Sequence, residues 1–172
     1  MLDHESELLK TERFRVVSLK TTFPDGRSQT KSIVRHPGAV VILPIFADGR
    51  ICLIENYRLA VGQTLIELPA GTREPDETSL VTAQRELTEE TGYHAADWQS
   101  LTQFFVSPGI MDERMEVFVA SDLTAGDSNH QPDEMIRNRI ASFEEALQWI
   151  RNGRIVDAKT IAALLHYATF QR

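Results

Sequence analysis

Carboxylates gather between Glu67 and Glu90 in larger numbers than a soluble helix and its loop need for stability. Seven acidic residues lie in this stretch against two basic ones, Arg73 and Arg85. The acids are Glu67, Glu74, Asp76, Glu77, Glu86, Glu89 and Glu90. Such a segment repels itself unless cations lie among the side chains, and hard divalent ions with oxygen ligands are the natural occupants. The stretch therefore predicts metal-dependent chemistry.

A helix is predicted to carry three of these acids. Thr78 and the acids just before it form a cap-like start, and Gly92 falls where a helix would end in a left-handed cap. Apolar residues recur between them at helical spacing, at Leu80, Ala83 and Leu87. This pattern indicates a helix of about four turns.

On that helix, Glu86 and Glu90 are four residues apart and stack on one face, with Glu89 on the same flank. The arrangement costs stability through like-charge repulsion, so it favours a bound cation. The loop before the helix can fold Glu77 back toward this face. Arg85 can pair with a neighbouring carboxylate and hold it in place. A solvated, charge-rich surface helix is the alternative for the three glutamates alone.

The complete pattern resembles the Nudix box: Gly71, five residues, Glu77, seven residues, then Arg85-Glu86-Leu87-x-Glu89-Glu90-x-Gly92. Tyr93 replaces the usual aliphatic residue at the last position, which affects packing rather than metal binding. The resemblance implies a Nudix pyrophosphohydrolase with an α/β fold, an α/β/α sandwich around a mixed sheet. It implies Mg²⁺ as the cofactor, with Mn²⁺ as a substitute.

The same resemblance implies roles for individual residues. The implied metal ligands are the Ala70 carbonyl and the carboxylates of Glu77, Glu86, Glu89 and Glu90. Arg85 and Glu89 are implied to assist catalysis. The charge on the pyrophosphate oxygens repels a nucleophile, so two or three Mg²⁺ ions would neutralise them, orient water and stabilise the leaving phosphate.

Three further segments look like the ADP-ribose pyrophosphatase branch, namely ENYRLAVG at 55–62, ELPAG at 67–71 and SPG at 107–109. In that branch a proline follows the box by a roughly fixed interval, and Pro108 occupies this place. A plain loop between strands is the alternative for Pro108. The resemblance spans residues 38–167, and the tail at 153–167 also looks like that of other enzymes that cleave nucleotide sugars.

A general base must lie within hydrogen-bond reach of the attacking water. In the ADP-ribose branch it comes from an acidic loop beyond the box, which residues 129–134 (NHQPDE) match. Glu134 is therefore the first candidate, and Glu113, after the SPG turn, is its competitor. An ordinary exposed loop acid is the alternative for Glu134.

Three residues are candidates for contacts with the substrate: Pro108, which the resemblance implies sets specificity, Arg58 and Glu67. The family uses an arginine from the strand end where Arg58 lies, and a bidentate guanidinium suits phosphate oxygens. A plain surface arginine is the alternative. Glu67, beside the ELPAG loop, either holds the metal-binding loop in place or contacts the terminal ribose.

Composition limits the class of protein. The chain has 172 residues, 42% of them hydrophobic and 25% charged, which suits one globular domain with a full core. The net charge of -7 argues against nucleic acid or a membrane surface as a partner. The single cysteine, Cys52, excludes an intrachain disulfide and fits a reducing cytosol. No signal peptide or membrane span is predicted, so we expect a cytoplasmic location.

The chain is expected to divide near residue 37. Before this point, residues 13–21 and 29–35 flank a Pro-Asp-Gly turn and predict an antiparallel hairpin. Residues 1–37 therefore form an N-terminal β-segment, which the resemblance implies serves homodimerisation, and residues 38–172 form the Nudix domain. The run GAVVILPIFA that follows is typical of a central strand buried on both faces. Two helices, from a capping box at Ser142 and from near Asp157, should close the chain.

These expectations combine into one reaction: hydrolysis of ADP-ribose, a nucleoside diphosphate sugar, to AMP and ribose 5-phosphate. GDP-mannose or another nucleotide sugar is the alternative substrate. A catalytically silent nucleotide-binding sensor is the alternative from another class, against which the intact box argues. The preferred base and sugar, the number of metal ions and the exchange of the hairpin between subunits stay open.

Overall fold

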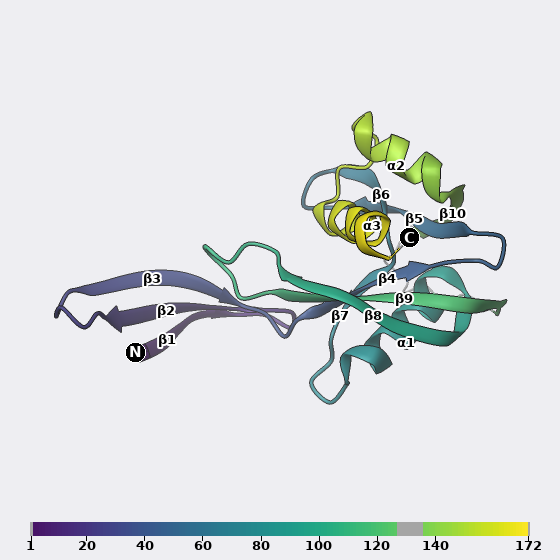
Figure 1. Ribbon diagram of the computed structural model, residues 1–172. Coiled ribbons are helices and arrows are strands. Elements are labelled where there is room, and N and C mark those ends of the chain that lie inside the picture. Colours follow the sequence, from purple (N-terminus) through teal and green to yellow (C-terminus); the bar gives the residue numbers. More distant parts are fainter. Residues whose placement is uncertain (1, 127–135, 172) are drawn as a thin grey trace.

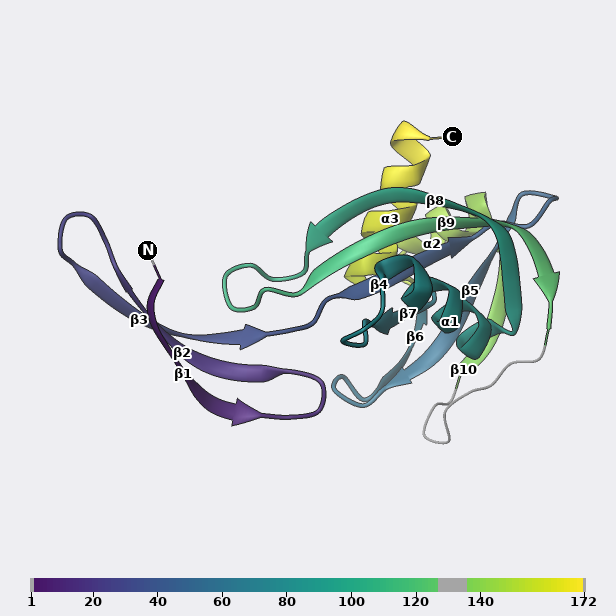
Figure 2. The same cartoon turned by 90° about the horizontal axis from the view of Figure 1, so that it is seen from below.

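Three β-sheets and three helices make up the part of the protein that the computed structural model describes, residues 2–126 and 136–171. One sheet projects from the rest, and the other two lie with the helices in the body (Figure 1). The same separation is visible from below (Figure 2). The hydrophobic core therefore lies in the body.

The projecting sheet is antiparallel and has the order β1-β2-β3. Its strands are β1 (Leu2–Lys10), β2 (Arg15–Thr22) and β3 (Ser28–Arg35). The predicted hairpin is β2 and β3. Strand β1 was not predicted, because polar or charged residues occupy most of it and its register comes from backbone pairing with β2. Ion pairs between Glu5 and Arg35 and between Glu7 and Arg15 add cross-strand contacts.

The projecting sheet joins the body through the connection between β8 and β9. Val34 N donates to Ile110 O at 2.9 Å, and Asp112 N donates to Val34 O at 3.1 Å. The Asp112 carboxylate accepts hydrogen bonds from the Arg35 guanidinium and the His36 amide. The end of β3 is thereby fixed beside the loop that contains Pro108.

The central sheet of the body is mixed, as expected, with the order β7-β4-β9-β8. Its strands are β4 (Ala39–Pro44), β7 (Ala70–Thr72), β8 (Tyr93–Phe105) and β9 (Arg114–Ala125). Strand β4 runs parallel to β9 and antiparallel to β7. All six of its residues are buried, because its continuous apolar run faces the core on both sides.

The second sheet of the body is antiparallel and has the order β10-β5-β6. Its strands are β5 (Arg50–Arg58), β6 (Gln63–Glu67) and β10 (Ile136–Ser142). The turn into β5 uses Gly49 at φ 83°, a conformation that favours glycine. Strand β6 ends at Glu67, the first residue of the ELPAG loop, and this loop leads into the Nudix box.

Helices cover the central sheet on both faces. Helix α1 (Ser79–Thr91) packs Ala83 and Leu87 against Val40 and Ile42 of β4. Helices α2 (Phe143–Arg151) and α3 (Ala158–Phe170) share the other core cluster with Val41 and Leu43 of β4 and with β5. Alternate residues of a strand point to opposite faces, so β4 belongs to both clusters. This arrangement confirms the predicted α/β sandwich.

The predicted helix ends are confirmed. Thr78 caps α1 by accepting from Val81 N, and Gly92 ends it in the left-handed conformation at φ 74°. Ser142 and Glu145 form the capping box of α2. Asp157 caps α3 by accepting from Thr160 N. No helix in residues 2–126 and 136–171 is both long enough and apolar enough to span a bilayer.

Candidate active site

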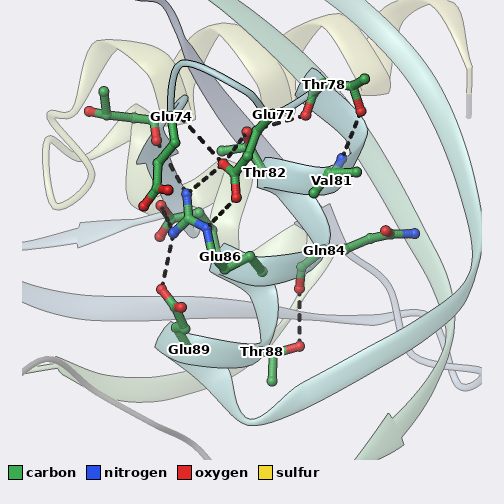
Figure 3. Close-up of polar contacts among 11 residues, drawn as sticks. Glu74, Glu77, Thr78, Val81, Thr82, Gln84, Glu86, Thr88 and Glu89 are labelled. Carbon is green, nitrogen blue, oxygen red and sulfur yellow. Dashed lines mark hydrogen bonds and ion pairs between the residues drawn. The ribbon is translucent and has the colours of Figure 1, made fainter.

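Arg85 binds carboxylates from α1 and from the loop before it. Its Nε and Nη2 atoms donate to the two carboxylate oxygens of Glu77 at 2.9 and 3.0 Å. Its Nη1 atom donates to Glu86 at 2.7 Å and to Glu89 at 3.1 Å, and Nη2 also contacts Thr72 O. Figure 3 shows Glu77, Glu86 and Glu89 around this one group. The bidentate pair fixes the loop against the helix, as the sequence predicted.

The guanidinium changes the acidity of its main partner. Hydrogen bonds from Arg85 lower the pKa of Glu77 to about 2, burial opposes the shift, and the Thr82 hydroxyl at 2.9 Å reinforces it. The hydrogen bond from Arg85 to Glu77 in turn raises the pKa of Arg85, against the effect of burial, with Glu86 contributing. Both groups are therefore charged at neutral pH, where they form an ion pair.

Two further glutamates of α1 lie against β7. Glu90 is 3% exposed, and its carboxylate accepts a hydrogen bond from Ala70 N at 2.9 Å. A side chain at position 71 would overlap the Glu86 carboxylate in its present position. A larger residue there would therefore displace the Glu86 side chain.

Two hollows on the described surface share part of their lining. The larger hollow has a volume of about 740 Å³ and extends from the turn at residues 10–15 to Glu86 and Glu90. The smaller hollow, of about 460 Å³, lies between Phe104, Glu113 and the start of α3. Arg58 and the strand Ala70–Thr72 line both, so the two hollows are neighbours.

The donor chemistry of the larger hollow fits a hard divalent cation, because Glu86, Glu90 and the backbone of Ala70 all line it. Glu77 and Glu89 are not among its lining residues and contact Arg85 instead. Within residues 2–126 and 136–171, no three His, Cys, Asp or Glu side chains are grouped as a metal site. Glu86 does both, since it lines the hollow and accepts from Arg85, whereas Glu90 lines the hollow and Glu77 and Glu89 contact only Arg85 of these two features.

Glu67 lies at the centre of a second charged group, which we call the Glu67 cluster: Glu67, Arg58, Asp157 and Lys159. Glu67 is fully buried and accepts from Arg58 Nε at 2.9 Å, Arg58 Nη2 at 2.6 Å and Lys159 Nζ at 2.5 Å. Burial raises the pKa of Glu67, but the hydrogen bonds and charges of Arg58 and Lys159 outweigh it, and the pKa lies below its ordinary value. Glu67 is thus a buried anion with two cationic partners.

The remaining predicted residues lie in different places. Glu113 lines the smaller hollow, with its carboxylate 3.8 Å from His36 Nδ1. Pro108 is exposed in the turn between β8 and β9 and lines neither hollow. Glu134 lies outside the described residues. The choice between Glu113 and Glu134 as the base therefore stays a prediction.

Sequence reasoning missed Asp157 and Lys159 as site residues. Both line the smaller hollow, and Lys159 is 9% exposed on the face of α3 that also buries Ala163. One signal could have identified Lys159: it lies four residues before a core alanine on an apolar helix. Buried lysines are rare unless they are paired. Cys52 is fully buried, and burial raises the pKa of its thiol to about 12.

Comparison with known proteins identifies a family and a branch. The profile of the NUDIX domain matches residues 34–164. The chain is 38% identical over 168 residues to a methanol dehydrogenase activator of Bacillus methanolicus, covering 93% of this chain and 91% of the relative. It is 36% identical over 143 residues to an ADP-ribose pyrophosphatase of Bacillus subtilis (strain 168), covering 82% of this chain and 77% of the relative.

A solved structure supports the fold. The crystal structure of an ADP compounds hydrolase superposes with a TM-score of 0.84 and covers 98% of this chain and 91% of its own. The two sequences are 21% identical, so this likeness concerns the fold alone. The match includes the projecting N-terminal sheet, since nearly the whole chain is covered.

Proposed function

Because the chain belongs to the NUDIX family and is a Nudix hydrolase of the ADP-ribose pyrophosphatase-like branch, we propose that it hydrolyses ADP-ribose to AMP and ribose 5-phosphate with a divalent metal ion. One observation carries the proposal: the hollow lined by Glu86 and Glu90 shares Arg58 and the strand Ala70–Thr72 with a second hollow lined by Lys159. Carboxylates for a metal ion and cations for phosphate thus line two neighbouring hollows.

Each residue near the larger hollow has a distinct task in this reaction. Glu86, Glu90 and the Ala70 carbonyl would hold Mg²⁺, or Mn²⁺ in its place, which when bound neutralises phosphate oxygens and activates water. Arg85 holds Glu86 in position through its Nη1 atom at 2.7 Å. Arg58 offers its guanidinium to a phosphate group, and Glu113 or Glu134 takes the proton of the attacking water.

The size of the space supports a substrate larger than a single phosphate. Hollows of about 740 and 460 Å³ fall within the range of about 300 to 1,000 Å³ that is usual for small-molecule sites. Phe104, Phe105 and Met115 give the smaller hollow apolar walls suited to a base or a sugar ring. A nucleoside diphosphate sugar combines these features with a charged diphosphate, and GDP-mannose or another nucleotide sugar is the alternative.

A substrate panel tests the proposal. Release of the cleaved nucleotide products would be measured directly by chromatography for ADP-ribose, ADP-glucose, GDP-mannose, diadenosine polyphosphates and nucleoside triphosphates, with Mg²⁺ and with EDTA. We expect ADP-ribose to lead the panel and EDTA to abolish turnover. Another nucleotide sugar in first place would overturn the substrate but keep the reaction class, and undiminished turnover in EDTA would overturn the metal requirement.

A second candidate function is activation of a dehydrogenase. The relative from Bacillus methanolicus, which is named a methanol dehydrogenase activator, aligns with 93% of this chain at 38% identity. In the test, the protein is added to the methanol dehydrogenase of a Bacillus species, and the rate of methanol oxidation is measured. A rate increase that Glu90→Gln abolishes would tie the activation to hydrolysis, and an unchanged rate would exclude this function for that partner.

The projecting sheet supports a homodimer as the functional form. Val17 is its only fully buried residue among positions 4–35, while Leu8, Leu9 and Phe23 are 59%, 52% and 41% exposed. A three-stranded sheet gains stability from burying an apolar face, which this sheet does not do within one chain. A second copy of the chain would cover these residues.

A further inference from the structure

Glu67 is the most deeply buried charged group beside the two hollows. It has no exposed surface, and its two carboxylate oxygens bind Arg58 of β5 and Lys159 of α3. The β5–β6 hairpin and the distant helix α3 therefore meet at one side chain. A buried carboxylate is costly unless it is paired, and here two cations pair with it.

The second acid of the Glu67 cluster completes the charge balance. Asp157 forms an ion pair with Lys159 Nζ at 3.0 Å and accepts from the amide and hydroxyl of Thr160 at 3.0 and 2.6 Å. Two cations thus face two anions in the Glu67 cluster. The Glu67 cluster therefore needs no ligand to neutralise it. It can bind a ligand through hydrogen-bond donors, not through an unbalanced charge.

Donors do remain at both cations. Arg58 uses Nε and Nη2 on Glu67, and no described residue accepts from its Nη1 group. Lys159 has three N–H bonds and two carboxylate partners, Glu67 and Asp157. Each cation therefore has at least one N–H bond that no described residue takes up.

The position of these donors indicates what they serve. Arg58 lines both hollows beside Ala70 and Gly71, whereas Lys159 lines only the smaller one. A diphosphate that begins at Glu86 in the larger hollow would pass Arg58 before it comes to Lys159. The two cations would then contact the phosphate that is farther from Glu86.

We propose that Glu67 is a positioning residue that holds Arg58 and Lys159 together as a receptor for one phosphate group of the substrate. The inference rests on the proposed function and names Arg58 and Lys159 as the pair that binds this phosphate. Glu67 fixes the guanidinium plane through two hydrogen bonds and brings the ammonium of α3 to the same hollow. Prior orientation of donors lowers the cost of binding, because less freedom is lost when the ligand arrives.

The first test measures steady-state hydrolysis of ADP-ribose by Glu67→Gln and Lys159→Met. We expect KM to rise about tenfold or more while kcat changes less than about threefold, since binding of one phosphate is weakened and the Glu86 side is intact. Lys159→Arg, which keeps the charge, should recover most of the loss. A purely structural role for Glu67 would instead lower the melting temperature and the active fraction at an unchanged KM.

The second test is independent of the substrate. Binding of inorganic pyrophosphate to metal-free protein in EDTA would be measured by calorimetry, with Glu55→Gln as the matched control. Glu55 lies on the same strand as Arg58, is paired with Arg139 at 3.1 Å and lines neither hollow. We expect wild type and Glu55→Gln to bind equally and folded Glu67→Gln to bind about tenfold more weakly.

The outcomes separate the inference from the proposed function. If ADP-ribose is not hydrolysed by wild type but pyrophosphate binding still depends on Glu67 and Lys159, the function fails and the receptor stands. If wild type does not bind pyrophosphate, or if folded Glu67→Gln binds it as wild type does, the receptor is refuted whatever the substrate is. If Glu67→Gln does not fold, Lys159→Met is tested in its place. An unchanged affinity of Lys159→Met for pyrophosphate would equally refute the receptor.

Discussion

At the scale of single residues, neighbouring glutamates of α1 face different surroundings. Glu90 lines the larger hollow and is held by Ala70 N, whereas Glu89 contacts the Nη1 atom of Arg85 and does not line that hollow. The sequence places both on one flank and assigns both to metal binding. The structure therefore predicts unequal consequences for the same substitution at the two positions.

Glu90→Gln should lower kcat/KM by about a hundredfold or more with Mg²⁺ present, because a neutral amide is a poor ligand for a hard cation. The amide oxygen can still accept from Ala70 N, so the melting temperature should stay close to that of wild type. Glu89→Gln should cost less. Wild-type activity in Glu90→Gln would refute the proposed metal site, and equal losses in both variants would restore Glu89 as a ligand.

The pair of Glu77 and Arg85 predicts a dependence of stability on pH. Arg85 lowers the pKa of Glu77 in the folded protein to about 2 from an ordinary value of 4.5. The pair therefore contributes its full stabilisation above about pH 4.5 and loses it as the pH falls toward 2. The free energy of unfolding by urea, measured in EDTA, should differ more between wild type and Glu77→Gln at pH 6 than at pH 3. A difference that does not change with pH would contradict the prediction.

At the scale of elements, a buried hydrogen bond attaches α3 to the loop that carries the site. Leu68 N donates to the Thr160 hydroxyl at 2.8 Å, and the hydroxyl donates to Asp157 at 2.6 Å. Thr160 is fully buried, so no water replaces these contacts when they are lost. The loop after Glu67 and the start of α3 are thereby held together.

Thr160→Val keeps the shape of the side chain and leaves Leu68 N without its acceptor. We expect a loss of about 1–3 kcal/mol in the free energy of unfolding, the cost of an unsatisfied buried donor. Thr169→Val is the matched control, because Thr169 lies in the same helix, is exposed and bonds only to Leu165 O. Its effect should stay within about 0.5 kcal/mol. The free energy of unfolding would be measured with urea. Equal losses in Thr160→Val and Thr169→Val would show that the buried hydrogen bond does not contribute more to stability than the exposed one.

At the scale of the whole molecule, the projecting sheet predicts an assembly larger than one chain. Wild type should have twice the mass of the 19.4 kDa chain in multi-angle light scattering. Leu8→Glu combined with Leu9→Glu should give a monomer, because charge is introduced where an apolar face would be covered. Arg151→Glu, on the exposed end of α2, is the control and should stay dimeric. A monomeric wild type would refute the dimer. The N-terminal segment of residues 1–37 would then have no role in dimerisation.

Local sequence determined much of this protein. The caps at Thr78, Gly92 and Ser142, the buried strand β4 and the Nudix box were all predictable, since each depends on residues within one or two turns or one strand. Strand β1 escaped prediction because its register comes from pairing with β2 and not from its own pattern.

Only the tertiary structure decided which charged residues meet. Glu67 and Lys159 are 92 positions apart in the sequence, and no local rule predicts that β6 and α3 bring them within 2.5 Å. The sequence likewise does not indicate that Glu86 and Glu90 line the hollow whereas Glu77 and Glu89 do not. The box identifies the chemistry because its ligands are local in sequence. The substrate side combines the β5–β6 hairpin with the distant helix α3, and its geometry follows from how the sheets and helices pack.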